Sequence, residues 1–460
     1  MKRISIKLGK EIVEVNLPDN TEILSTEQPK PLRNPDFFIQ KALKNSIGSP
    51  GLDKIIEQKL KKNPQAKAVI VISDNTRPVP YKGKAGILWP IIEKLLAKNI
   101  SNERILILVA TGTHRPLSEK ELREMLDPRV FDYKIPIKNH DCRDKNNLVY
   151  LDKTSRGSSV YINRDYMEAD IKILTGLVET HFMAGASGGR KSICPGLIGE
   201  ESIYIFHGAP MLASPKASDL IIDGNPCHQE ALEIAKKAGA DYIINVTLDQ
   251  DFKLTGVFAG DLEEAHKQAV KQIKKYVTIP LEKEYDIVIT HAGFVGINQY
   301  QTAKAAVVAI PALKPNGKLI MIANNNDKDL IGSEKYKAVL HLLKIIGAKQ
   351  FTRLVLSADW PFIPDQWQVQ MWTRLFSKIP PENFIYYSPR LSFNDYKIIP
   401  GVDGNIFLPA NKRYKGTLKD ISQIIESAIN KIDKEFKLKG KRGFNISFLS
   451  DGPYGIPIKI

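Results

Sequence analysis

Short apolar runs recur along the chain, separated by segments with the periodicity of amphipathic helices. Runs that are apolar on both faces predict strands of a buried parallel sheet. Their regular alternation with helical segments predicts the α/β fold class, with two α/β domains whose sheets are mostly parallel. The strands expected on this basis are Ala66–Ile72, Arg104–Ala110, Ile171–Val178, Tyr242–Thr247, Tyr285–Thr290, Gly317–Ala323, Arg353–Ser357 and Phe384–Tyr387.

The chain has 460 residues, which is too long for one compact domain and suits two. The segment Pro280–Glu284 follows a Lys- and Gln-rich helical segment and is the best boundary. We therefore expect an N-terminal domain of residues 1–280 and a C-terminal domain of residues 281–460, with the active site in the cleft between them. Packing of the C-terminal tail, residues 405–460, against the first domain is compatible with this division.

Polar clusters directly follow two of the predicted strands. Asp74, Thr76 and Arg77 come after the strand that ends at Ile72, and His114 comes after the strand that ends at Ala110. Open α/β sheets bind ligands at the carboxyl ends of their strands, so the two clusters are expected on the same edge of one sheet. A capped turn explains either cluster alone, but two such clusters weaken that explanation. A capping box, Ser118-x-x-Glu121, starts the next helix.

A glycine-rich loop follows the predicted strand Ile171–Val178. It runs from Gly185 to Gly189 and ends in Arg190 and Lys191, a composition that suits an anion site. The Walker pattern G-x-x-x-x-G-K-[ST] fails here, because Arg190 stands where glycine is required. A phosphate-binding kinase or ATPase-like enzyme remains the alternative function for this loop.

Composition narrows the class of protein. The net charge of +15 comes from lysines spread over the chain without a basic arm, so we expect anionic small ligands and no nucleic acid. The amino terminus lacks the apolar core of a signal peptide and no apolar run reaches transmembrane length, so we expect a cytoplasmic protein with no membrane partner. Three scattered cysteines form neither a disulfide framework nor a zinc site, and the histidines show no self-sufficient metal motif.

The sequence resembles the nickel-pincer lactate racemase family over most of its length. The resemblance rests on motifs in matching order and with similar spacing: Asp74-x-Thr76-Arg77-Pro78, Gly112-Thr113-His114-Arg115, His181-Phe182-x-Ala184-Gly185-x-Ser187-Gly188-Gly189-Arg190-Lys191, the later His207, and Gln301-x-x-Lys304. The long central motif is the most specific of these.

The resemblance implies a racemase or epimerase of 2-hydroxy acids that works by hydride removal and return. Its cofactor would be a nickel-pincer nucleotide, pyridinium-3-thioamide-5-thiocarboxylic acid mononucleotide, covalently bound at Lys191. His207 would be the one protein ligand of nickel, and His114 and His181 the paired acid–base groups. The substrate would be bound by Arg77, Gln301 and Lys304. The remaining cofactor contacts would come from Asp74, which is also expected to position Arg77, and from Thr76, Ser187, Gly188, Gly189 and Arg190.

The resemblance leaves the particular 2-hydroxycarboxylate open, with lactate one of several. It also implies cofactor-biosynthesis proteins as partners, because other enzymes must make the pincer nucleotide. A non-catalytic anion-binding or nucleic-acid protein is the third class considered, and it would have no use for paired histidines.

Overall fold

The apolar runs of the sequence form two six-stranded sheets in the computed structural model, which describes residues 1–440 and 443–460. The chain divides into two compact units. Gln28–Tyr276 form one unit, called the histidine unit, and Met1–Glu27 with Val277–Ile460 form the other, called the carboxy-terminal unit.

The sheet of the histidine unit has the strand order β13-β12-β9-β4-β5-β6. Neighbouring strands are parallel except β13, which forms an antiparallel hairpin with β12. Residues of both faces of β4 are buried, as the continuous apolar pattern predicts. The strands are β4 (Ala68–Ser73), β5 (Ile105–Ala110), β6 (Ile137–Asn139), β9 (Ile171–Leu177), β12 (Tyr242–Leu248) and β13 (Leu254–Gly260).

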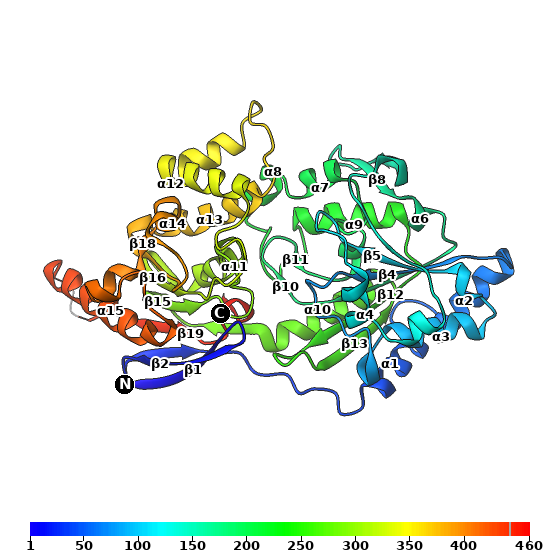
Figure 1. Cartoon of the computed structure of the whole chain (residues 1–460), viewed down its shortest axis with the longest axis horizontal. Helices are drawn as coiled ribbons and strands as arrows, with labels where there is room; N and C mark the ends of the chain where they lie inside the picture. Colours follow the sequence, from blue (N-terminus) through cyan, green and yellow to red (C-terminus); the bar gives the residue numbers. More distant parts are fainter. Residues whose placement is uncertain (441–442) are drawn as a thin grey trace. The chain divides into compact units, whose positions relative to one another are not determined.

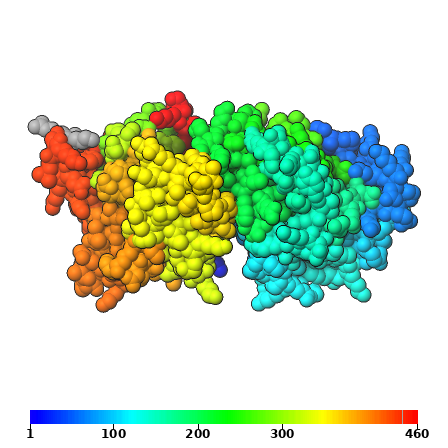
Figure 2. All heavy atoms as spheres, turned by 90° about the horizontal axis from the view of Figure 1, so that it is seen from above, coloured from blue at the N-terminus to red at the C-terminus, as the bar shows by residue number. Residues whose placement is uncertain are grey.

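Helices and short strands surround this sheet (Figure 1). One core joins α1, α2 and α3 to apolar residues of β4, β5, β9 and β12. The hairpin of β7 and β8 packs on α7 and α9, and Figure 2 shows the blue-green and green segments meeting on the surface of this unit. The elements are α1 (Pro35–Lys44), α2 (Leu52–Lys62), α3 (Leu88–Ala97), α4 (Glu119–Met125), α5 (Arg129–Asp132), β7 (Leu148–Lys153), β8 (Ser159–Asn163), α6 (Arg164–Met167), β10 (Thr180–His181), β11 (Gly185–Ala186), α7 (Glu200–Phe206), α8 (Ala209–Ala213), α9 (Pro226–Ala238) and α10 (Glu264–Val277).

The carboxy-terminal unit contains a second, fully parallel sheet with the order β18-β17-β16-β15-β19-β3. Its elements are β1 (Lys2–Leu8), β2 (Glu11–Leu17), β3 (Thr21–Leu24), β14 (Thr278–Leu281), β15 (Tyr285–His291), α11 (Gln299–Ala309), β16 (Leu313–Ile322), α12 (Glu334–Val355), α13 (Gln366–Lys378), β17 (Phe384–Tyr387), α14 (Phe393–Ile398), β18 (Val402–Asp403), α15 (Ile421–Leu438), β19 (Ile446–Leu449) and β20 (Ile456–Lys459).

The amino terminus departs from the predicted division at residue 280. Residues 1–27 belong with the C-terminal half of the chain, because β3 pairs with β19 in parallel and the β1–β2 hairpin shares a core with α15. The tail likewise packs within its own unit, where β19 pairs with β15 and β20 pairs with β14. Pairing between strands more than 400 residues apart leaves no signal in local periodicity.

The predicted strand Arg353–Ser357 is wrong, because Arg353 to Val355 form the last turn of α12. Val355 is buried on this helix. A short apolar run does not distinguish a buried strand from the end of a buried helix. Within the described ranges, no helix is both long and apolar enough to cross a membrane.

Candidate active site

Three loops of the histidine unit begin at the same edge of its sheet. They follow β4, β5 and β9, which are adjacent and parallel, so their carboxyl ends meet there. The loops carry Asp74–Arg77, His114 and the segment from Glu179 to Lys191. The expectation that the first two polar clusters share one edge is therefore confirmed by strand pairing.

Asp74 holds His114. Its Oδ2 lies 2.6 Å from Nδ1 of His114, and its Oδ1 accepts hydrogen bonds from the backbone N–H of Thr76 at 3.1 Å and from the Thr76 hydroxyl at 2.6 Å. Burial by itself raises the pKa of Asp74, but the hydrogen bonds from His114 and Thr76 outweigh it and hold the pKa below its usual value. Asp74 is therefore an ionised, buried carboxylate at neutral pH.

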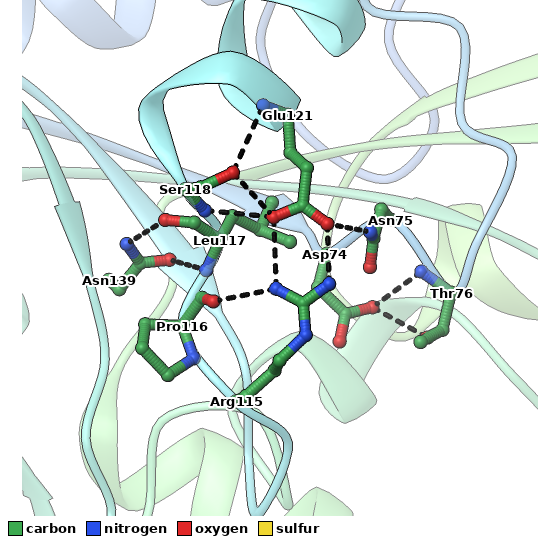
Figure 3. Close-up of polar contacts among 9 residues, drawn as sticks. All are labelled: Asp74, Asn75, Thr76, Arg115, Pro116, Leu117, Ser118, Glu121 and Asn139. Carbon is green, nitrogen blue, oxygen red and sulfur yellow. Dashed lines mark hydrogen bonds and ion pairs between the residues drawn. The ribbon is translucent and has the colours of Figure 1, made fainter. Parts of the chain in front are cut away.

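Glu121 ties the first two loops together, as Figure 3 shows. It accepts from the Asn75 side chain at 3.0 Å, and both its oxygens accept from the guanidinium of Arg115, the residue after His114. It also completes the predicted capping box with Ser118 at the start of α4. Hydrogen bonds from Arg115 and Ser118 lower the pKa of Glu121 far below its usual value. The sequence showed only the capping role; the link between two loops is a tertiary contact.

Replacement of Glu121 by Gln is expected to lower kcat by loosening the loop that carries His114. A misplacement of about 1 Å costs up to about 10²-fold in rate, which bounds the loss. The measurement is kcat for racemisation of a 2-hydroxy acid by protein that carries the expected cofactor. Glu119→Gln is the matched control, since Glu119 lies on the same helix and pairs with Arg123 on its surface. Equal activities of the two variants would contradict a role for Glu121 in holding the loop.

Arg77 is paired with a residue that the sequence analysis did not select. Its guanidinium forms an ion pair with the carboxylate of Glu179, and both side chains are about one-third exposed. The Asp74 carboxylate bonds to Thr76 and His114, so the contact of Asp74 with Arg77 is through its backbone carbonyl, which accepts from the Arg77 N–H at 3.3 Å. Glu179 directly follows the apolar run at Val178, and its distance of 102 residues from Arg77 explains why no spacing rule indicated the pair.

His181 lies in a tight turn between two short strands. It pairs with Gly185 across β10 and β11, and its Nδ1 accepts from the backbone N–H groups of Met183 at 3.3 Å and Ala184 at 3.1 Å. The Ser187 hydroxyl donates to the Leu177 carbonyl at 2.7 Å. These contacts connect the turn to the end of β9 and give the His181 ring a defined orientation.

Residues outside the predicted motif contact the glycine loop and fix its position. The Gly189 N–H donates to the Asn245 side chain at 2.9 Å. Gly188 has φ +73°, and a Cβ there would lie 2.7 Å from Val178 Cγ2, so a side chain does not fit. The Ser187 hydroxyl and the Gly189 amide belong to the residues expected to contact the cofactor, but both are bonded within the protein.

Arg190 is buried beneath this loop. Its guanidinium donates to the carbonyls of Ala184 at 2.8 Å and Gly188 at 3.3 Å. It also lies 2.9 Å from Nε2 of His266, the nitrogen that faces the Ser187 carbonyl at 2.9 Å. A 3₁₀ turn at Gly189–Ser192 follows the loop, where a Walker loop would begin an α-helix. The buried position of Arg190 thus accounts for its replacement of the Walker glycine and argues against the kinase alternative.

Lys191 and His207 come together at the end of this segment. Both are partly buried, and Nζ of Lys191 lies 5.1 Å from the ring centre of Phe206. Burial, followed by the charges of Arg190 and Arg77, lowers the pKa of Lys191 to about 7. Burial, followed by the charge of Lys191, lowers the pKa of His207 to about 3. At neutral pH the site therefore offers an unprotonated amine in a large fraction of molecules, and a neutral imidazole.

No cluster of three or more His, Cys, Asp or Glu side chains in residues 1–440 and 443–460 is arranged to hold a metal ion. A metal bound at His207 would therefore take its other ligands from a bound group. A neutral imidazole is the form that ligates metals, so the lowered pKa of His207 suits such a role.

Gln301 and Lys304 belong to the carboxy-terminal unit. They lie three residues apart near the start of α11, and both are partly exposed. Asn298 caps this helix by accepting from the Gln301 N–H at 3.0 Å. The neighbouring Gln299 is anchored in the interior by Tyr336, whose hydroxyl donates to Gln299 at 2.7 Å and accepts from Trp372 at 2.9 Å. This buried network fixes the helix start that presents Gln301 and Lys304.

The buried histidines beneath the loop predict acid sensitivity of the apoprotein. His228 stacks on His266, and burial lowers the pKa of His228 to about 3 and that of His266 well below its ordinary value. The unfolded chain therefore binds more protons than the folded one below the ordinary histidine pKa of about 6.5. The stability from His228 is complete above about pH 6.5 and is lost toward about pH 3, at about 1.4 kcal/mol per pH unit.

The measurement is the free energy of unfolding in urea at about pH 7, 6 and 5. His228→Phe is expected to flatten this pH dependence, because it removes a group that protonates only on unfolding. His341→Phe is the control, since His341 is exposed on α12. An unchanged slope in His228→Phe would show that His228 is charged or accessible in the folded protein.

Two family models match this chain. The lactate racemase N-terminal domain matches residues 8–219, and the lactate racemase C-terminal domain matches residues 281–386. The chain is 34% identical over 340 residues to the lactate racemase of Lactiplantibacillus plantarum, covering 73% of this chain and 76% of that protein. It is 31% identical over 382 residues to the lactate racemase of Thermoanaerobacterium thermosaccharolyticum, covering 82% and 86% of the two chains.

Solved structures give the same result for the fold. The lactate racemase apoprotein from Thermoanaerobacterium thermosaccharolyticum superposes with a TM-score of 0.82 at 26% identity, covering 99% of this chain and 100% of that one. A Thermotoga maritima protein superposes with a TM-score of 0.60 at 14% identity, covering 90% and 100%, and supports the fold alone.

Proposed function

Because this chain belongs to the lactate racemase family, we propose that it racemises lactate or a related 2-hydroxycarboxylate on a nickel-pincer nucleotide. One observation carries the proposal beyond family membership. The edge of one sheet holds two histidines, while a lysine with a pKa lowered to about 7 adjoins a third histidine that is neutral. This set provides acid–base groups, a nucleophilic amine and a metal ligand.

The side chains present suit the two proposed attachment points of the cofactor. Lys191 is a nucleophile only as the free amine, and its lowered pKa supplies that form near neutral pH. Neutral His207 suits the role of the single protein ligand to nickel. When bound, the nucleotide supplies a reversible hydride acceptor. We propose that six residues support the nucleotide: Asp74, Thr76, Ser187, Gly188, Gly189 and Arg190. Those whose polar groups are bonded within the protein would act by shaping the loops that bind it.

The protein's own groups bind the substrate and move its hydroxyl proton. We assign His114 and His181 to that proton, one for each enantiomer, because the two enantiomers present opposite geometry to one hydride acceptor. Arg77, Gln301 and Lys304 are the proposed ligands of the carboxylate and of the developing carbonyl oxygen, since cations and amide donors stabilise negative charge there. Glu179 holds Arg77 in place before substrate binds.

The proposal includes a cellular setting. Cofactor-biosynthesis proteins are expected partners, and the cytoplasm is the expected compartment. A small 2-hydroxycarboxylate is the expected ligand, without a nucleic acid or membrane partner. Salt-dependent binding to DNA would contradict this last point.

The test is intact-protein mass and nickel content of protein that was co-expressed with a cofactor-synthesis system. We expect a covalent adduct that maps to Lys191 and about one nickel per chain, as ligation by one histidine implies. A panel of single-enantiomer 2-hydroxy acids, followed by chiral chromatography, then identifies the substrate. Absence of adduct and nickel, from cells that load a known racemase, would refute the pincer proposal.

A further inference from the structure

We propose that the two acid–base histidines are held in opposite neutral tautomers, and that Asp74 is the positioning residue that fixes one of them. This inference deepens the proposed function and rests on it for its kinetic consequences. Its structural content, the position of one proton on each ring, is testable on the apoprotein.

His114 carries its proton on Nδ1. An ionised carboxylate only accepts hydrogen bonds, and Oδ2 of Asp74 lies 2.6 Å from this nitrogen. The other oxygen, Oδ1, is occupied by two donors from Thr76, so the carboxylate has a fixed orientation. Nε2 of a neutral His114 ring is consequently an acceptor, the form required of a general base.

His181 carries its proton on Nε2. Its Nδ1 faces the backbone N–H groups of Met183 and Ala184, which only donate. The surrounding turn maintains this geometry, because His181 pairs with Gly185 and the Ala184 carbonyl accepts from buried Arg190. Nε2 of a neutral His181 ring is consequently a donor.

The two histidines therefore differ in what they offer the substrate hydroxyl. A hydroxyl that faces His114 would pass its proton to Nε2 of that ring, and the bound nucleotide would supply the acceptor for the hydride of the neighbouring carbon. A hydroxyl that faces His181 meets an N–H donor. His181 accepts its proton only after its own proton has moved to Nδ1, which breaks the hydrogen bonds from Met183 and Ala184.

This difference is expected to appear in the kcat and KM values of the two enantiomers. Enantiomers have equal free energies, so kcat/KM is the same in both directions. A hydrogen bond from Nε2–H of His181 to the substrate hydroxyl, which is lost before the reaction, stabilises that substrate complex and lowers both kcat and KM for that enantiomer by the same factor. We expect the enantiomer that faces His181 to have the lower kcat and the lower KM.

Replacement of Asp74 by Asn provides the test of Asp74 itself. The two Thr76 donors retain the amide oxygen, so the NH₂ group of Asn turns to His114 and donates to Nδ1. The His114 proton then moves to Nε2, and neither ring offers a base. We expect a loss on the order of 10⁴-fold in kcat, the scale of enforcing the wrong tautomer on a catalytic histidine.

Asp74→Ala separates this effect from simple loss of structure. Alanine removes the orienting carboxylate without imposing a tautomer, so it is expected to retain more activity than Asn. A purely structural role for Asp74 predicts the reverse order, because Asn preserves the shape and the Thr76 contacts. Asp127→Asn is the stability control, since Asp127 is a buried carboxylate paired with Arg129.

The direct experiment is long-range ¹H–¹⁵N spectroscopy of ¹⁵N-histidine-labelled apoprotein at about pH 8.5, above the ordinary histidine pKa of about 6.5. His114→Gln and His181→Gln assign the signals. We expect a protonated Nδ1 in His114, a protonated Nε2 in His181, and reversal at His114 in Asp74→Asn. The same tautomer in both wild-type rings, or no reversal in Asp74→Asn, would overturn the inference. An apoprotein with the expected tautomers that loads cofactor but racemises no 2-hydroxy acid would instead refute the proposed function.

Discussion

Lys191→Ala is expected to carry no covalent adduct and to lose activity by about 10³-fold or more, the scale seen when a group that acts covalently is removed. The physical reason is that Lys191 is an amine prepared to react. Its pKa is lowered to about 7 by burial and by the charges of Arg190 and Arg77, whereas an ordinary lysine is protonated at that pH. The measurement is intact mass and racemisation rate after co-expression with cofactor-synthesis proteins.

The same pKa gives a pH dependence for loading in vitro. The free-amine fraction of Lys191 increases as pH rises through about 7, so the rate of adduct formation is expected to increase there and then level off. The apoprotein is also expected to gain stability from Lys191→Ala below the unfolded lysine pKa of about 10.4, because folding no longer hinders protonation of that group.

Lys172→Ala is the matched control for Lys191→Ala. Lys172 is a partly buried lysine of the same unit whose pKa burial lowers, but its Nζ donates to the Ala238 carbonyl away from the loop. It should keep the adduct. Lys191→Arg provides a second comparison, because arginine retains the positive charge and cannot supply a free amine. An adduct in either Lys191 variant would show that attachment occurs elsewhere.

His207→Ala is expected to lose the metal and to keep the organic part of the cofactor. If His207 is the one protein ligand, this variant should lose nickel and racemase activity while the organic adduct remains at Lys191. The lowered pKa of His207 predicts that ligation persists at pH values where an ordinary histidine becomes protonated, so nickel retention should extend below about pH 6.5. The measurements are nickel per chain and intact mass on the same sample.

His341→Ala is the control for His207→Ala, since it removes an exposed histidine of α12. Full nickel content in His207→Ala would contradict the proposed ligand. Joint loss of nickel and adduct would indicate that His207 is needed for attachment itself. It would refute the proposal that Lys191 attaches the cofactor independently of nickel binding by His207.

The sequence alone determined the features that depend on local pattern. Continuous apolar runs predicted the central strands β4, β5 and β9, because strands covered on both faces need no polar alternation. Polar residues after those strands predicted a shared site edge, because parallel strands end on the same side. Arg190 at the Walker glycine position argued against a standard phosphate loop, and its buried guanidinium supplies the structural reason.

Only the tertiary structure decided the partners of those side chains. Glu179 rather than Asp74 holds the Arg77 side chain, and Glu121 links the loops of Asn75 and Arg115. The amino-terminal strand β3 joins the sheet of the C-terminal half. Hydrogen bonds and strand pairs between distant segments depend on how the chain folds back on itself. Periodicity and motif spacing report only on neighbours along the chain, so they could not predict the orientation of the proposed catalytic groups.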